Sequence, residues 1–257
     1  NWRVSLMSLK CFIERETEDI YLIDAIYYAI SQGADIINAS WGDTEYSRAM
    51  YEAVEAAESA GVLFVAAAGN SSVSLEQTSM YPAAFELSNV ISVGAMNDDD
   101  EIANFSSTGH NHTHIMAPGK GCYSTDPEGG YGFKNGTSFA APEVSGVAGL
   151  LLDYYPGADA NFLRGKILGS ATKTDVYNYT CVSGARLNAF RPFLADSSST
   201  PPVDDLTLQY TGFNGAIVSF SEKKNASLYD IRYSHTEITE ENFFEALAVK
   251  NIPHPAD

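Results

Sequence analysis

Asn135-Gly136-Thr137-Ser138-Phe139-Ala140-Ala141-Pro142 is the most informative stretch of the sequence, because a glycine and a serine here precede a run of small residues. Gly136 permits a tight turn, and the small side chains let the following helix pack closely on a sheet. Pro142 is expected in the first helical turn, where a missing N–H is tolerated. Since a helix N-terminus stabilises a developing oxyanion, the pattern predicts that Ser138 is a nucleophile. The alternative is that Ser138 only caps a buried helix.

Two apolar segments upstream end in polar groups. Val62-Leu63-Phe64-Val65-Ala66-Ala67-Ala68-Gly69-Asn70 is typical of a buried parallel strand that ends in a glycine and an amide. Ala34-Asp35-Ile36-Ile37-Asn38-Ala39-Ser40-Trp41-Gly42 is a second short strand, and its Ser-Trp-Gly end offers edge N–H and C=O groups to an extended peptide. Ligands of open α/β sheets bind at the carboxyl ends of strands, which predicts that Asn70 lies at the active site.

Helical and strand patterns alternate over much of the chain. A first helix is predicted from apolar residues at helical spacing before Gly33, namely Ile20, Ile23, Tyr27 and Ile30. An alanine-rich helix is predicted from Ser47 to Ala60, where Gly61 ends it. Strands are expected near Val4, Ile36, Leu63, Val90 and Ile115. The alternation predicts an α/β fold, in which helices cover both faces of a parallel sheet.

These segments, in this order, resemble the subtilisin-like serine proteases (subtilases, peptidase family S8). GTSFAAPEVSG resembles the nucleophile motif of that family, AAAGN its oxyanion-asparagine motif, and DIINASWG the strand that lines its substrate cleft. YPAAF, VISVGAM, ANFSSTG and MAPG follow the order of the family, and SGARLNAF resembles the end of its catalytic domain. The resemblance covers roughly residues 1–194 and implies an incomplete subtilisin-like catalytic domain, for which we set the bounds 1–195.

The resemblance also implies an activity and the residues that perform it. The activity is that of a serine endopeptidase, which hydrolyses peptide bonds of a polypeptide substrate through an acyl-enzyme. Ser138 would be the nucleophile, and the Asn70 side-chain amide would donate to the oxyanion together with the Ser138 backbone N–H. The walls of the primary specificity pocket would be Ser40, Trp41 and Gly42 on one side and Ala67, Ala68 and Gly69 on the other. Trp41 is bulky where the family often has a small or aliphatic residue.

The catalytic acid and base of the family have no counterpart in this sequence. A serine nucleophile needs a histidine base that a carboxylate orients. In subtilases the Asp and His motifs precede all the segments above, and neither motif occurs here. No histidine is followed by Gly-Thr or precedes the Asn70 strand; the five are His110, His112, His114, His235 and His254.

We therefore expect a fragment of a longer protease. The fragment alone is predicted to be inactive, because the segment with the Asp and His lies upstream and is missing. The same segment would carry sheet strands, so we also expect an unpaired apolar sheet edge. The alternative is a pseudoprotease, whose cleft binds extended peptides without catalysis.

Composition excludes several other classes of function. The chain has 257 residues, 45% of them hydrophobic, and 33 acidic against 15 basic residues give a net charge of -18. Such a charge disfavours binding to nucleic acid and to anionic membranes. No apolar run approaches the roughly 18 residues of a membrane span. Cys11, Cys122 and Cys181 are odd in number and widely spaced, which favours neither a disulfide framework nor a zinc site.

No metal site is predicted and no cofactor is required, with calcium as a structural ion left as an alternative. His110, His112 and His114 would share one face of a strand, a spacing that also suits zinc or copper. The segment 97–101 supplies oxygen ligands for calcium but fits a hairpin turn equally well. The resemblance implies a cation near Tyr81-Pro82-Ala83 in some family members, held by backbone carbonyls.

The C-terminal part of the chain has a different pattern. Residues 196–202 are a polar linker that ends in two prolines. In 203–257 apolar residues alternate around Leu208, Val218 and Ile231, which predicts short antiparallel strands. This segment resembles the first part of a fibronectin type III domain, and we expect a partial all-β sandwich that acts as a spacer. The combination implies an extracellular (secreted) or cell-surface enzyme.

Overall fold

The structure is a computed structural model that describes residues 3–13, 16–127, 129–194, 207–210, 216–219, 232–233 and 247–248. The chain divides into two compact units, Asn1–Leu194 and Ala195–Asp257. The predicted linker, residues 196–202, lies outside the described residues.

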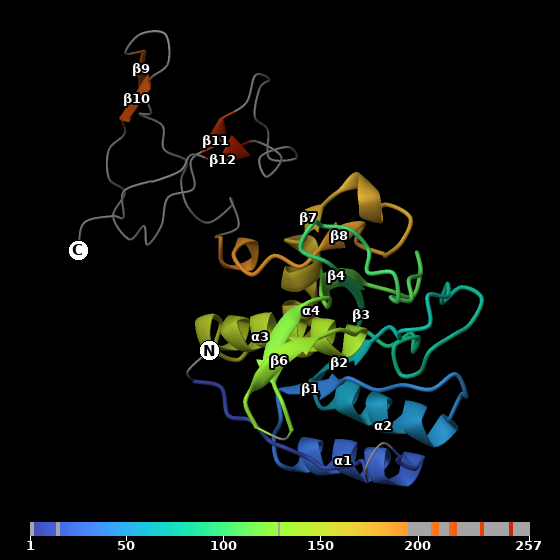
Figure 1. Cartoon of the computed structure of the whole chain (residues 1–257). Coiled ribbons are helices and arrows are strands. Elements are labelled where there is room, and N and C mark those ends of the chain that lie inside the picture. Colours follow the sequence, from blue (N-terminus) through green and yellow to red (C-terminus); the bar gives the residue numbers. More distant parts are fainter. Residues whose placement is uncertain are drawn as a thin grey trace. The chain divides into compact units, whose positions relative to one another are not determined.

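The first unit alternates helices and strands along the chain (Figure 1). Its helices are α1 (Asp19–Ser31), α2 (Arg48–Ser59), α3 (Thr137–Tyr154) and α4 (Ala160–Gly169), with short 3-10 helices η1 (Asp175–Tyr177) and η2 (Arg191–Phe193). The strands of its main sheet are β1 (Ile36–Ala39), β2 (Leu63–Ala67), β3 (Val90–Met96), β4 (Ile115–Pro118), β7 (Thr172–Lys173) and β8 (Ala185–Arg186). A separate antiparallel hairpin consists of β5 (Cys122–Thr125) and β6 (Tyr131–Lys134).

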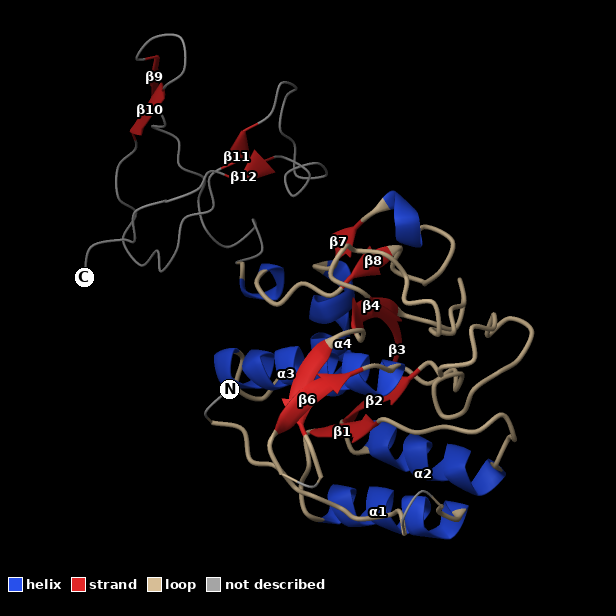
Figure 2. Ribbon diagram, viewed as in Figure 1, coloured by secondary structure: helices blue, strands red, loops and turns tan. Residues whose placement is uncertain are grey.

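The main sheet has the order β1-β2-β3-β4-β8-β7 and is parallel except for the β7–β8 pair. Leu63, Val65 and Ala67 of β2 pack into a core with α3 and α4, whereas Phe64 and Ala66 pack into a second core with α1 and α2. Figure 2 shows these two helix pairs on opposite sides of the strands. Because alternate side chains of a strand face opposite ways, every residue of β2 is buried. The predicted parallel sheet with helices on both faces is confirmed.

The predicted helices form, and one of them buries a different face from the predicted one. In α2 the Ser47 hydroxyl accepts the Met50 N–H at 3.3 Å, which caps the helix where the sequence predicts its start. In α1 the buried residues are Leu22, Ile26 and Ala29, while Ile20 is 53% and Tyr27 47% exposed. Apolar residues flank both sides of this helix in the sequence, and packing against α2 selects the buried side.

The strand expected near Val4 is wrong. Residues 3–10 form no strand, and Val4 is 42% exposed. A strand needs ladder partners for its backbone groups, and residues 3–10 have none among the residues described here. Among the described residues, β1 pairs only with β2, so the other edge of β1 has no strand partner. Ile36 and Ile37 of β1 are half-buried.

The described residues of the second unit form two short antiparallel pairs. β9 (Thr207–Tyr210) pairs with β10 (Ala216–Ser219), and β11 (Arg232–Tyr233) pairs with β12 (Leu247–Ala248). The all-β sandwich and its likeness to a fibronectin type III domain stay predictions, because most of 203–257 lies outside the described residues. None of the helices described is both long and apolar enough to cross a membrane.

Candidate active site

The carboxyl ends of β1 and β2 meet the start of α3. The two strands are parallel neighbours, so Ser40 follows β1 and Asn70 follows β2 at the same edge of the sheet. Helix α3 packs across β1 to β4 and begins at Thr137, one residue before Ser138. The sheet thus brings together three predicted site residues that are far apart in the chain.

Ser40 and Ser138 are joined by two hydrogen bonds. The Ser138 hydroxyl donates to the Ser40 carbonyl at 3.0 Å, and the Ser40 hydroxyl donates to the Ser138 carbonyl at 2.8 Å. The expectation that Pro142 lies in the first helical turn is wrong, since Pro142 is the sixth residue of α3. The missing N–H of Pro142 leaves the Ser138 carbonyl without its helical donor four residues on. The Ser40 hydroxyl supplies that hydrogen bond instead.

We predict that the Ser40 hydroxyl and the residue at position 142 are energetically coupled. Ser40→Ala leaves the Ser138 carbonyl without a donor, so the free energy of unfolding should fall by about 1 kcal/mol. In a Pro142→Ala background the new backbone N–H at position 142 takes over, and the cost of Ser40→Ala should drop by half or more. Urea unfolding of the four proteins measures the coupling. Equal costs in both backgrounds would mean that the bond contributes no free energy at this carbonyl.

The Asn70 side chain is oriented by Thr137, a residue that the sequence did not single out. The Thr137 N–H and hydroxyl donate to Asn70 Oδ1 at 2.8 and 3.0 Å. A backbone N–H only donates, so the oxygen of the amide must face Thr137 and Nδ2 must face away. The Thr137 hydroxyl also accepts the Gly69 N–H at 3.1 Å, which links the end of β2 to the start of α3. The sequence signal that could have identified Thr137 is its position directly before Ser138.

Two donor nitrogens lie close to one point near Ser138. A methyl group placed on Gly136 would lie 3.6 Å from Asn70 Nδ2 and 3.6 Å from the Ser138 backbone N. No acceptor for either of these two groups occurs in the described part of the chain, whereas the Phe139 N–H donates to Gly136 O. Gly136 has φ +150° and no side chain that could fill this point, and the Phe139 ring atom Cδ2 also lies 3.6 Å from it. This geometry suits an oxyanion.

The two predicted pocket walls lie on either side of Met80. An ideal Cβ on Gly42 would lie 3.1 Å from Met80 Sδ, and one on Gly69 would lie 2.9 Å from Met80 Cε. Trp41 is half-buried against the α1/α2 core, with its ring 6.5 Å from that of Phe64. Ala67 and Ala68 are buried at the end of β2. Met80 therefore occupies the space between the walls, and no sequence pattern pointed to it.

The described histidines form neither a base for Ser138 nor a metal cluster. The recorded hydrogen-bond partner of the Ser138 hydroxyl is the Ser40 carbonyl. His110, His112 and His114 lie in the loop before β4 rather than on a strand, so they share no strand face. Of the residues described, no three His, Cys, Asp or Glu side chains group as metal ligands do. His235 and His254 lie outside the described residues.

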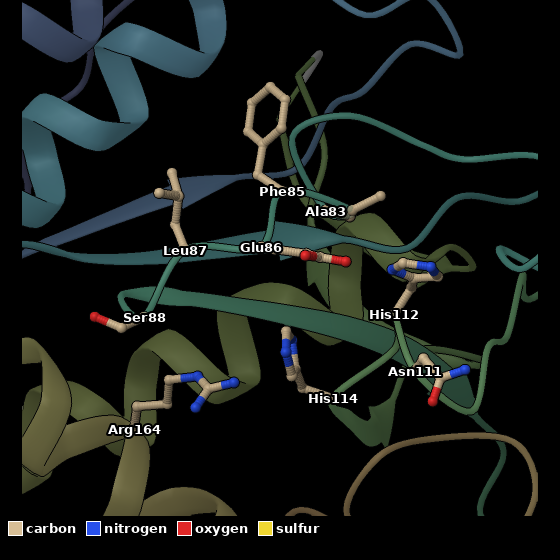
Figure 3. A pocket seen from close by; sticks show the side chains of 10 residues that line it. Ala83, Phe85, Glu86, Leu87, Ser88, Asn111, His112, His114 and Arg164 are labelled. Atoms are coloured by element: carbon tan, nitrogen blue, oxygen red, sulfur yellow. The ribbon is translucent and has the colours of Figure 1, made fainter.

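The two segments considered for calcium have different surroundings. Calcium takes six to eight oxygen ligands. Ala83 of the 81–83 loop lines a cavity whose wall also carries Arg164, the imidazoles of His112 and His114, and the carboxylate of Glu86 (Figure 3). In the 97–101 turn Asn97 Oδ1 accepts the N–H groups of Asp99 and Glu101. Calcium as a structural ion stays a prediction at both segments.

His114 makes the stability of the fold dependent on pH. Burial and the neighbouring Arg164 and His112 charges lower the pKa of His114 from 6.5 to about 4. Between these values the unfolded chain binds a proton that the folded chain refuses, so stability falls as the pH drops from about 6.5 to about 4. We expect a loss of about 2 kcal/mol between pH 7 and pH 5 from this group.

The matched variant for this prediction is His114→Asn. Its side-chain oxygen replaces His114 Nδ1, which accepts the Ser92 N–H at 2.9 Å, and it does not titrate. Urea unfolding at the two pH values should give a smaller loss for the variant. Other groups titrate in both proteins, so their contributions cancel when the two losses of stability are subtracted. One such group is Glu76, whose pKa the Asn111 hydrogen bonds lower. Identical losses would contradict the prediction.

Comparison with known proteins identifies the family. The model of the subtilase family matches residues 1–190. Subtilisin DY of Bacillus licheniformis is 41% identical over 152 residues, which are 59% of this chain and 54% of that protein. Subtilisin E of Bacillus subtilis (strain 168) is 39% identical over 153 residues, 59% of this chain and 39% of that protein. The chain thus spans about half or less of the length of these relatives.

Solved structures agree with this assignment. The prenylagaramide maturation protease PagA has a TM-score of 0.61 at 31% identity, over 74% of this chain and 70% of that one. The patellamide maturation protease PatA has a TM-score of 0.61 at 35% identity, over 70% of this chain and 69% of that one. The family match covers most of the chain, and its ordered motifs meet in one site around Ser138, so the chain belongs to the subtilase family of serine proteases.

Proposed function

We propose that this chain supplies the nucleophile, the oxyanion hole and part of the substrate cleft of a serine endopeptidase. The observation that carries the proposal is that Asn70 Nδ2 and the Ser138 backbone N lie within 3.6 Å of one point, the Cβ position of Gly136, two residues before Ser138. A cleft that only binds peptides has no need of two free donors next to a serine. This arrangement therefore favours catalysis over the pseudoprotease alternative.

The proposed reaction follows from these groups. The Ser138 oxygen attacks the carbonyl carbon of the peptide bond, and its proton passes to a histidine base. The carbonyl oxygen becomes an oxyanion that accepts hydrogen bonds from Asn70 Nδ2 and the Ser138 N–H. The C–N bond then breaks, the amine leaves with the proton, and water hydrolyses the acyl-enzyme. We propose that the base and its carboxylate partner come from a segment outside the described residues.

The Met80 side chain limits the specificity pocket in this proposal. Met80 lies between Gly42 and Gly69, so the room for a substrate side chain is small. In a protein extended upstream by about 100 residues, a domain-scale length, Met80→Gly should raise kcat/KM for substrates with a large apolar P1 side chain, relative to those with alanine, by about tenfold or more. Peptide p-nitroanilides that differ only at P1 measure the ratio. A ratio that stays at the wild-type value would exclude Met80 from the pocket.

A fluorophosphonate probe tests the proposed function directly. We expect no labelling of the 257-residue chain. We expect labelling at Ser138 once the protein is extended upstream by about 100 residues, a domain-scale length. Circular dichroism and thermal unfolding show whether both proteins are folded. A folded, extended protein that does not react would favour the peptide-binding pseudoprotease.

The remaining parts of the proposal concern substrates and location. Subtilase membership favours polypeptide substrates, and the net charge of -18 argues against nucleic acid as a partner. We propose an extracellular or cell-surface location, with the 203–257 segment as a spacer of fibronectin type III kind. No step of the proposed reaction uses a cofactor.

A further inference from the structure

A cavity of about 300 Å³ is lined by residues that the candidate active site does not use (Figure 3). Its walls come from the 83–88 segment, from the loop that carries Asn111, His112 and His114, and from Arg164 of α4. None of the predicted catalytic or pocket residues lines it. The cavity therefore calls for an explanation of its own.

Arg164 is the dominant charge in the cavity wall. Its Nε donates to the Val90 carbonyl at 3.0 Å, and the side chain is half-buried. None of the ion pairs recorded for the described residues involves Arg164. Burial lowers the pKa of Arg164. A guanidinium has five N–H groups, and among the described residues only the Nε–H of Arg164 has an acceptor.

His114 adds a neutral donor to the same wall. Its Nδ1 accepts the Ser92 N–H, so the neutral ring carries its hydrogen on Nε2. His112 lies farther along the wall, with Nε2 3.9 Å from Glu76 Oε2. The hydroxyl-bearing Ser88 also lines the cavity. The cavity thus offers donors from a cation, a neutral imidazole and a serine.

The single carboxylate of the wall does not compensate Arg164. In Figure 3 the Glu86 side chain extends toward His112 and away from Arg164. Glu86 is exposed, and water solvates its charge. Arg164 and His114 together therefore leave a part of the cavity that is rich in donors and positive in charge.

We propose that this cavity binds a small tetrahedral oxyanion, of the phosphate or sulfate class, between Arg164 and His114. An arginine fork donates two parallel hydrogen bonds to such an anion, and these charge-assisted bonds are stronger than neutral ones. The anion accepts from His114 Nε2–H without a change of protonation. The site stabilises the fold, and it is independent of the proposed peptidase activity.

Thermal unfolding of the chain with added sodium phosphate tests the proposal. The buffer is free of phosphate and sulfate, and sodium chloride keeps the ionic strength constant. Binding at a single site gives saturable stabilisation. When the phosphate concentration is ten times the Kd, the equilibrium constant for folding should rise about elevenfold. Sulfate should act in the same way. We expect the effect to vanish in Arg164→Gln and to persist in Arg48→Gln, which removes a cation paired with Glu52 elsewhere.

A second measurement covers the case in which Arg164→Gln does not fold. In the wild-type chain, phosphate should saturably raise the pKa of His114, which NMR of its imidazole protons measures. The absence of saturable stabilisation in the wild type overturns the proposal, as does equal stabilisation of Arg164→Gln. Saturable stabilisation by acetate but not by phosphate would also overturn it, because a carboxylate would then be the ligand.

Discussion

Ser138→Ala should lower kcat by a factor on the order of 10⁶, the size found when the nucleophile of another subtilase is removed. The protein for this experiment is extended upstream by about 100 residues, where we propose that the acid and the base lie. The effect is large because no other group in the proposed mechanism attacks the carbonyl carbon. Hydrolysis of a peptide p-nitroanilide gives kcat, and fluorophosphonate labelling should disappear in the same variant.

Ser145→Ala is the matched control. Ser145 lies on the same helix, where its hydroxyl donates to Asn38 Oδ1 at 3.0 Å and to the Ala141 carbonyl at 3.2 Å. It has no part in the proposed mechanism, so activity and labelling should stay close to wild type. If Ser138→Ala kept substantial activity, or if both variants lost it equally, Ser138 would not be the nucleophile.

Asn70→Asp should lower kcat by about 10² to 10³ with little change in KM, as found for the oxyanion-hole amide of another subtilase. The substitution is nearly isosteric, and one carboxylate oxygen still accepts from the Thr137 N–H and hydroxyl. The other oxygen replaces Nδ2, so a donor to the oxyanion becomes a negative charge. The loss appears in the transition state, where the oxyanion exists, and little in substrate binding.

Asn135→Asp controls for the added charge. Asn135 Oδ1 accepts the Gly121 N–H at 2.7 Å, close to the nucleophile in sequence but outside the proposed oxyanion hole. We expect this variant to keep kcat within a few-fold of wild type. A similar loss in both variants would mean that charge near the site, rather than the Asn70 donor, causes the effect. Asn70→Ala is less informative, because it also leaves the Thr137 N–H unpaired, at a cost of about 1–3 kcal/mol.

The fold class followed from local sequence patterns. Alternating apolar helices and strands require a layered α/β arrangement, and the strand ends at Ser40 and Asn70 mark the edge where such sheets bind ligands. The structure confirms this arrangement, since β1 and β2 are parallel neighbours and α3 begins beside their ends. The strand predicted near Val4 is wrong, because a local pattern is not sufficient for a strand. Its pattern is local, but a strand forms only where a partner is present.

Local sequence patterns predict the α/β sheet with helices on both faces and the strand ends at Ser40 and Asn70, since periodicity and strand ends are local properties, and the resemblance to subtilases implies their grouping with Ser138. Only the tertiary structure decided that Met80 lies between Gly42 and Gly69, and that the Ser40 hydroxyl replaces the hydrogen bond lost at Pro142. It also brought Arg164 and His114 to one cavity. The physical reason is the same in each case: these contacts join segments distant in the chain, and packing, which has no local signature, sets them.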